Sequence, residues 1–150
     1  MTAAGVEPAS VYITNAVKHF KWEAGGRKGA GAGGAGERGK RRMHKKPLWT
    51  EVVACRPWLL AELEVVRPRL VVCLGATAAQ SLLGHAFRLT KHRGEVLSPG
   101  GGYEVLATVH PSSLLRMPDE TARHAAKRQF LDDLRQAAER VRKPRADDDR

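Results

Sequence analysis

The apolar run Leu70–Leu74 restricts the fold of this chain more than any other stretch. It follows a basic, proline-containing turn at 67–69 and ends at Gly75. A strand that is apolar on both faces is typical of a parallel sheet with helices covering each side. Two parallel strands need a long crossover connection, which is usually a helix, so this run predicts alternating strands and helices.

One helix is predicted before this run and another after it. Thr50 is placed to cap a helix that runs to about residue 66, and Pro57 inside it predicts a kink or a break. The small residues of 76–83 predict a second helix, which Gly84 ends.

Further strands and a long helix complete the pattern. Residues 11–17 are β-branched and aromatic and predict a strand, while 94–97 and 103–109 predict two strands around a glycine-rich turn. Asp119 is placed to cap a last helix, whose apolar residues recur every three or four positions. This order predicts an α/β fold, a three-layer α/β/α sandwich with a mostly parallel sheet. Because the first strand comes so early, we expect the sheet to be incomplete at its N-terminal side.

Composition indicates one domain with a short polar segment at each end. Residues 1–10 predict a disordered lead-in, residues 11–141 the domain, and residues 142–150 a charged tail. Within the domain, residues 24–39 are rich in glycine and predict a flexible loop. Residues 40–47 follow it as a basic loop.

The net charge of +10 indicates a polyanionic partner, and nucleic acid is the first candidate. No apolar run approaches the roughly 20 residues needed to span a membrane, so we expect no membrane contact. The start of the chain lacks a signal-peptide pattern, and the two cysteines, Cys55 and Cys73, cannot form a disulfide framework. We therefore expect a cytoplasmic protein, and we expect a monomer.

The densest group of candidate functional residues lies at 108–116. A predicted strand ends beside His110, and a proline, Ser112, Ser113 and Arg116 follow it closely. Polar groups at the carboxyl ends of strands are where open α/β sheets bind ligands. The run is equally consistent with a plain strand-to-helix junction in which a serine caps the helix.

Other candidates stand alone in the sequence. Asn15 offers a donor and an acceptor that suit the edge of a base, or it is a satisfied turn residue. His44 lies among lysines and arginines, either as a functional group or as one more solvated residue. Cys73, in mid-strand, is expected to be a packed thiol. The chain has no C-x-x-C and no histidine pair with metal-binding helix spacing, so a complete zinc site is not expected.

Five runs of the sequence occur in an order that is informative as a set. They are V-Y-I-T-N-A-V-K-H-F at 11–20, K-R-R-M-H-K-K-P at 40–47, T-E-V-V-A-C-R-P-W-L at 50–59, L-G-A-T-A-A at 74–79 and H-P-S-S-L-L-R at 110–116. Together they resemble the uracil-DNA glycosylase superfamily, within it the iron–sulfur branch (family 4-like), and most of all the UdgX-type class that becomes crosslinked to uracil-containing DNA. The K-R-R-x-H run is the most diagnostic, with Met43 where isoleucine is expected.

This resemblance implies a role for each matching residue. Asn15 would read the edge of uracil, and His110 would donate to the uracil oxygen where charge builds as the glycosidic bond breaks. His44 would be the nucleophile that captures C1′ of the sugar in a covalent adduct. Its cationic neighbours disfavour the charged imidazolium, which keeps the ring nucleophilic. The remaining residues implied to bind uracil or DNA are Arg41, Arg42, Ser112 and Arg116.

The resemblance also implies a [4Fe–4S] cluster, with Cys55 and His19 as two of its ligands. The implied substrate is uracil-containing DNA, expected to be single-stranded, from which uracil must flip out. The family's C-x-x-C pair and Gly-Glu-x-Pro-Gly loop are not found in the sequence, so two cluster ligands and part of the uracil pocket are missing. We predict that the chain alone is unstable and a poor uracil-DNA glycosylase unless that motif is supplied. The alternatives are a nucleic-acid-binding remnant of the family and a generic basic α/β domain.

Overall fold

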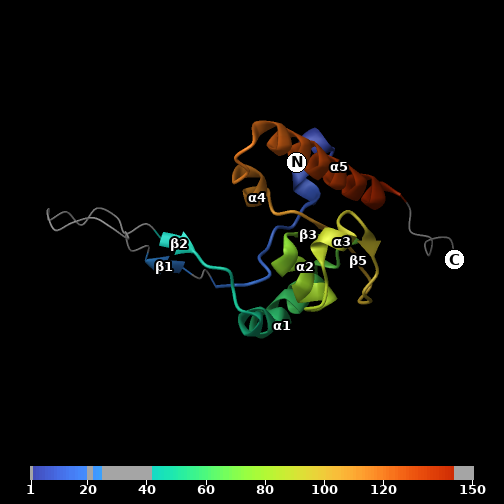
Figure 1. The fold of residues 1–150 in the computed structure, drawn as a ribbon. Helices are drawn as coiled ribbons and strands as arrows, with labels where there is room; N and C mark the ends of the chain where they lie inside the picture. The colour runs from blue at the N-terminus through green and yellow to red at the C-terminus, as the bar shows by residue number, and fades with distance from the viewer. Residues whose placement is uncertain (1, 20–21, 25–41, 144–150) are drawn as a thin grey trace, which may run out of the picture.

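The computed structural model describes residues 2–19, 22–24 and 42–143. The larger of the two sheets that these residues form lies between two layers of helices (Figure 1). The predicted α/β class is confirmed, and so is the three-layer arrangement. In the described part of the chain, no helix combines the length and the apolar character needed to cross a membrane.

The central sheet has three strands among the described residues, in the order β3-β5-β4. β3 (Leu70–Leu74) pairs with β5 (Glu104–Thr108) in parallel over five positions. β4 (Val96–Leu97) pairs with the other edge of β5 in antiparallel fashion over two positions. The sheet is therefore mixed, and its longer pairing is the parallel one that the apolar run predicts.

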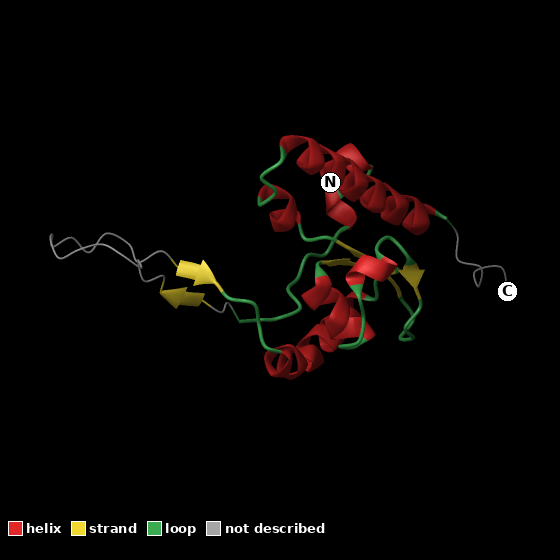
Figure 2. Ribbon diagram, viewed as in Figure 1, coloured by secondary structure: helices red, strands yellow, loops and turns green. Residues whose placement is uncertain are grey.

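Helices cover both faces of this sheet (Figure 2). α5 lies on one face with α4 beside it, and α1, α2 and α3 lie on the other. The helices are α1 (Trp49–Val66), α2 (Ala76–Leu83), α3 (Leu89–His92), α4 (Pro111–Leu115) and α5 (Glu120–Arg142).

The alternation of side chains along β5 gives each face its contacts. Val105 and Ala107 join a buried cluster with Cys73 and with side chains of α1 and α2. Thr108, which has no exposed surface, instead forms a hydrogen bond to α5. Cys73 is the packed thiol that its position predicts, and burial raises its pKa to about 12.

Local signals set two helix ends as predicted. The Asp119 carboxylate caps α5 by accepting hydrogen bonds from the N–H groups of Thr121 and Ala122, at 3.3 and 2.9 Å. Gly84 ends α2 with a φ of +92°, a conformation that a residue with a Cβ rarely adopts.

The predicted start of α1 at Thr50 is wrong by two residues. Leu48 is the N-cap, and its N–H donates to the Glu51 carboxylate at 2.6 Å, so Thr50 lies inside the first turn. The helix also continues past Pro57 as one element. Val52, Cys55 and Leu59 are buried on both sides of the proline, so packing compensates for the backbone hydrogen bond that proline removes.

Residues 11–17 do not form the predicted strand. Tyr12 and Ile13 are 58% and 73% exposed, and the segment is attached to α1 through side chains instead of to a sheet edge through its backbone. β-propensity reflects a fit to a half-buried pleated surface, and this segment has no strand beside it among the described residues.

The lead-in at 1–10 also has more structure than predicted. Two short 3-10 turns, Thr2–Ala4 and Pro8–Ser10, form there, and Ala4 is buried. The Gly5 carbonyl accepts a hydrogen bond from the Arg142 guanidinium at 2.8 Å, which fixes this segment on the end of α5. The predicted tail lies outside the described residues from 144 onward.

Part of the predicted basic loop is a strand. β1 (Trp22–Ala24) and β2 (Arg42–His44) pair antiparallel, with His44 opposite Trp22. This hairpin projects from the side of the molecule on which α4 lies (Figure 1). The glycine-rich stretch between the two strands, from 25 to 41, lies outside the described residues.

Candidate active site

His110 occupies the position between β5 and α4, two residues after the strand ends. Its ring caps α4, because Nδ1 accepts the Ser112 N–H at 3.1 Å and lies 2.8 Å from the Ser112 hydroxyl. The Ser113 N–H and hydroxyl both donate to the His110 carbonyl, at 2.9 and 2.7 Å. The predicted serine cap is therefore wrong, and the histidine itself is the cap.

This capping bond fixes the tautomer of the His110 ring. An amide N–H can only donate, so Nδ1 must be the acceptor, and the neutral ring carries its proton on Nε2. His110 is exposed, and no described residue accepts a hydrogen bond from Nε2. The site therefore presents one N–H donor at the carboxyl end of the sheet.

Gly75 brings the end of β3 against the same histidine. Its N–H donates to the carbonyl of Thr108 at 2.8 Å, which joins the carboxyl ends of the two parallel strands. Its φ is +94°, and a Cβ placed there would lie 3.2 Å from the Cβ of His110. Glycine thus permits both the turn into α2 and the close approach to His110.

A buried polar network that the sequence analysis missed lies just behind this strand end. The Asp133 carboxylate accepts from the Thr108 hydroxyl at 2.5 Å and from Nε of Arg93 at 2.8 Å. Arg93 also donates to Gln129 at 2.9 Å. One sequence signal could have revealed it, because Asp133 falls on the apolar stripe of the last helix, between Phe130 and Ala137. We call Thr108, Asp133, Arg93 and Gln129 the Thr108 network.

Asn15 is exposed on the segment that crosses α1. The Thr14 hydroxyl donates to Glu62 at 2.6 Å, and the Lys18 ammonium group bonds both Glu62 oxygens at 2.8 Å. We call these three residues the Glu62 clamp. Hydrogen bonds from Lys18 and then Thr14 lower the pKa of Glu62. No described residue hydrogen-bonds the Asn15 amide, so the clamp holds the segment and leaves that amide open to a ligand.

The other predicted DNA-binding residues are placed only in part. Arg116 is the exposed C-cap of α4, on the same short element that begins at His110. The backbones of Arg42 and His44 lie in β2, and the structure does not describe where their side chains point. Arg41 lies outside the described residues. The roles assigned to these four residues stay predictions.

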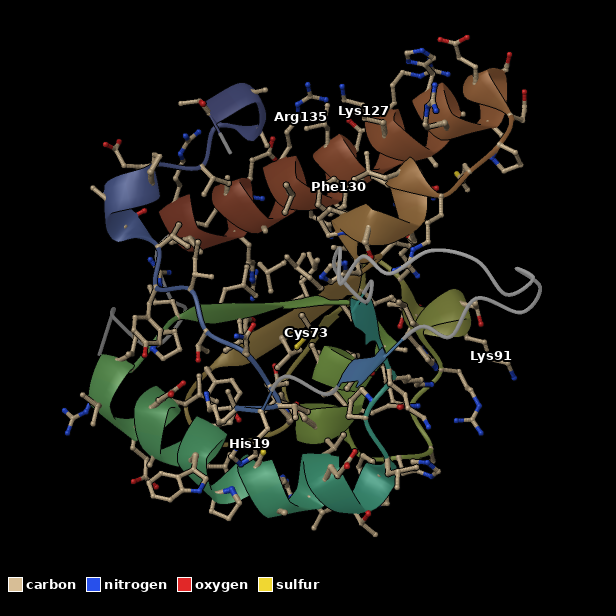
Figure 3. All side chains as sticks on the ribbon, turned by 90° about the vertical axis from the view of Figure 1, so that its left-hand side faces the viewer. His19, Cys73, Lys91, Lys127, Phe130 and Arg135 are labelled. Carbon is tan, nitrogen blue, oxygen red and sulfur yellow. The ribbon has the colours of Figure 1, made fainter. Side chains whose placement is uncertain are left out.

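Cys55 and His19 come from neighbouring segments but do not complete a cluster site. Cys55 is buried in α1, and its sulfur accepts the Lys18 N–H at 3.4 Å. His19 is the residue after Lys18, so the two predicted ligands come from segments that touch. The other cysteine, Cys73, lies in the sheet, while His19 lies beside α1 (Figure 3). A [4Fe–4S] cluster takes four protein ligands, and the described residues contain no group of three metal-binding side chains. The residues that the structure describes therefore do not fit a complete cluster.

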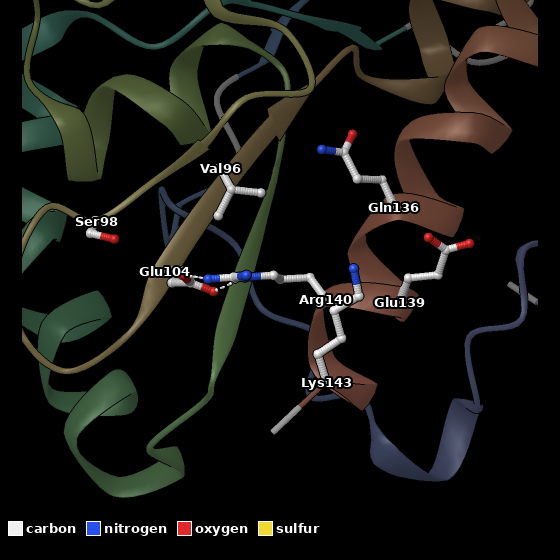
Figure 4. A pocket seen from close by; sticks show the side chains of 7 residues that line it. All are labelled: Val96, Ser98, Glu104, Gln136, Glu139, Arg140 and Lys143. Atoms are coloured by element: carbon white, nitrogen blue, oxygen red, sulfur yellow. Dashed lines mark hydrogen bonds and ion pairs between the residues drawn. The ribbon is translucent and has the colours of Figure 1, made fainter. Parts of the chain in front are cut away.

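A separate groove of about 450 Å³ lies at the other end of β5 (Figure 4). In it Glu104, the first residue of β5, forms a two-point ion pair with Arg140 of α5. Since His110 follows the last residue of the same strand, this groove lies at the opposite edge of the sheet from the candidate site.

Comparison with known families decides which family the chain belongs to. The family model described as the uracil DNA glycosylase superfamily matches residues 1–135. This chain belongs to the uracil-DNA glycosylase superfamily. The resemblance read from the five sequence runs is confirmed at that level.

Several curated glycosylases are similar to this superfamily member. It is 36% identical over 101 residues to the type-4 uracil-DNA glycosylase of Thermotoga maritima. This match covers 67% of this chain and 50% of the relative. It is 37% identical over 113 residues to the type-5 uracil-DNA glycosylase of Pyrobaculum aerophilum, covering 73% of this chain and 40% of the relative. A type-4 enzyme of the same organism is 26% identical over 125 residues, covering 79% and 54%. The chain thus spans about half the length of the relatives it matches.

Proposed function

We propose that this protein recognises uracil flipped out of single-stranded DNA and acts at its glycosidic bond, with His110 stabilising the departing base. The capping of α4 by Nδ1 of His110 carries the proposal, because it makes Nε2–H a fixed donor. Superfamily membership and the names of the similar proteins support uracil as the base.

The chemistry requires a donor of this kind. When the bond between C1′ of the sugar and N1 of uracil breaks, its electron pair leaves with the base, and negative charge spreads to a carbonyl oxygen of uracil. A preorganised N–H aimed at that oxygen stabilises the transition state by about 2.7–4 kcal/mol, or roughly 100- to 1,000-fold in rate. His110 is suited to this role because the Ser112 N–H keeps Nδ1 an acceptor, which leaves the ring proton on Nε2 before DNA binds.

Asn15 is proposed to read the uracil. An amide offers a donor and an acceptor side by side, as does the edge of uracil. Its exposed position on a clamped segment supports this role, since the amide needs no rearrangement of a protein partner. Ser112 and Arg116 lie on or at the end of α4, which His110 caps. They are proposed to stabilise that element and to contact the DNA backbone.

We further propose that His44 captures the sugar in the UdgX-type manner. A lone pair of the neutral imidazole would form a bond to C1′ as N1 departs, and the ring would then release a proton to solvent. The K-R-R-M-H run supports this role, as does the projection of β2 on the side of α4 (Figure 1). In the absence of capture, water attacks C1′ and excision results. No step runs through a cluster, since the two cysteines of the sequence cannot supply the four ligands that a cluster takes.

A denaturing gel tests the proposal directly. The protein is incubated with a labelled single-stranded oligonucleotide that contains one uracil, and with a matched thymine oligonucleotide. We expect a retarded, heat-stable band with uracil only, or a cleaved product after alkali if water attacks instead. His44→Ala should remove the retarded band, and His110→Gln should slow either product by roughly 100- to 1,000-fold.

The control variant is His124→Ala, because His124 is an exposed histidine on α5 whose one ion-pair contact among the described residues is a long one to Glu120. It should behave as the unaltered protein. The absence of both products, with equal and salt-sensitive binding of the two oligonucleotides, would contradict the proposal. The protein would then be a nucleic-acid-binding remnant of the family.

A further inference from the structure

We propose that Thr108 and Asp133 are positioning residues for His110, holding the strand end that presents its Nε2–H to the base. This inference rests on the role proposed above for His110. Its basis is the Thr108 network, in which a side chain of α5 bonds the last residue of β5. Only Val109 separates that residue from His110.

Two independent hydrogen bonds anchor Thr108. Its hydroxyl donates to Asp133 on one face of the sheet, and its carbonyl accepts the Gly75 N–H at the neighbouring strand end. The side-chain bond limits rotation of the strand end, and the backbone bond limits its shift away from β3. Together they fix the point from which His110 reaches its capping position.

The network also joins a third element to this point. Gly94 donates its N–H to the Ala107 carbonyl at 2.9 Å, and a Cβ on it would lie 3.2 Å from Oδ1 of Asp133. The segment after α3 therefore packs closely against the same Asp133 carboxylate that bonds Thr108. Any shift of that carboxylate must move the strand end, the helix or this segment.

The network is poorly explained as a stabilising device alone. Asp133 is 8% exposed, and Nη2 of Arg93 is buried without a hydrogen-bond partner among the described residues. A buried ion pair gains little over an apolar pair of similar size, and an unpaired buried N–H is a cost. An apolar residue at position 133 would suit the stripe between Phe130 and Ala137. The charged pair of Asp133 and Arg93 is better explained by a role in placing Thr108, which Asp133 bonds.

The test compares two substitutions of one residue. Thr108→Val keeps the shape and removes the hydroxyl, while Thr108→Ser keeps the hydroxyl and so the bond to Asp133. The readout is the ¹⁵N spectrum of the His110 ring, assigned with His110→Gln, which reports whether the proton is on Nε2 or Nδ1. We expect T108V to increase the Nδ1–H form or broaden the His110 signals, and T108S to match the unaltered protein.

Excision or capture provides the second readout. T108V should lower the rate of the chemical step by up to about 100-fold with KM little changed, because a small misplacement of a catalytic group affects the transition state most. Asp133→Asn should act in the same direction. Asp132→Asn is its matched control, since Asp132 is the preceding residue on α5 and, among the described residues, pairs with Arg135 at the surface. It should change neither readout.

Two results would overturn the inference. One is a folded T108V protein whose His110 signals equal those of the unaltered protein. The other is a T108S protein that is perturbed as much as T108V, since the hydroxyl would then not be the cause. Should T108V not fold, Thr108→Ala carries the same comparison. The spectrum needs no activity, so an inactive protein would count against the proposed function and leave this test intact.

Discussion

His110 and Asn15, the two described residues proposed to contact uracil, are held in different ways. His110 follows a strand that pairs with β3, and its ring caps a helix, so backbone hydrogen bonds fix it from both sides. Asn15 lies on a segment without strand pairing, which the Glu62 clamp attaches to α1 by side chains. The proposed donor for the departing base is thus part of the fold, while the attachment of the proposed reader depends on surface charges that pH and salt can alter.

The largest effect is expected where the fold holds His110 most closely. Gly75→Ala forces a Cβ into a φ of +94° and within 3.2 Å of the His110 Cβ. The backbone strain alone should cost about 1–3 kcal/mol of unfolding free energy, measured in urea. The contact should also displace the histidine and lower the excision rate.

Gly84→Ala is the matched control for this prediction. Its φ is +92°, and a Cβ there meets no atom within 4 Å. We expect a similar loss of stability in this variant with the rate of excision unchanged. Equal rates in the two variants would show that the approach of Gly75 to His110 has no part in function.

A smaller effect is expected at the clamp. Glu62→Gln removes the charge that holds Thr14 and Lys18, so the segment with Asn15 should loosen. We expect weaker binding of the uracil oligonucleotide, with little change in unfolding free energy because the pair is near the surface. Binding is measured by fluorescence anisotropy. Glu64→Gln, on the same helix and exposed, should leave the affinity unchanged.

The clamp should also make binding depend on pH in the acid range. The pKa of Glu62 is lowered in the folded protein, so its contribution is full above the ordinary glutamate pKa of 4.5 and is lost as pH falls through the lowered value. The segment should therefore stay attached at a pH where a free glutamate is already protonated. In the E62Q protein the acid-side change in affinity should be absent.

The smallest effect is expected from the Ser112 hydroxyl. Ser112→Ala removes the 2.8 Å contact with Nδ1 of His110 but keeps the backbone N–H that donates to the same atom. We expect a loss of about 0.5–1.5 kcal/mol in unfolding free energy and an unchanged His110 tautomer in the ¹⁵N spectrum. A switch of the tautomer would instead assign the cap to the hydroxyl.

Much of the fold was predictable because its signals are local. The apolar run at Leu70–Leu74, the cap at Asp119 and the stop at Gly84 each act through a few neighbouring residues. The prediction for residues 11–17 was wrong because a strand also needs a partner edge, which residue types do not reveal. The serine cap at 112 or 113 was wrong because the histidine before Pro111 can accept the same N–H.

Of the candidate site, the sequence by itself determined the family, the strand-end histidine and the basic run, because each depends on residues close together in the chain. The tertiary structure alone decided where the Asn15 segment is attached and that Asp133 bonds Thr108. These last features join residues 25 to 48 positions apart. Such contacts are set by which faces of the strands and helices pack together, and a local pattern does not contain that information.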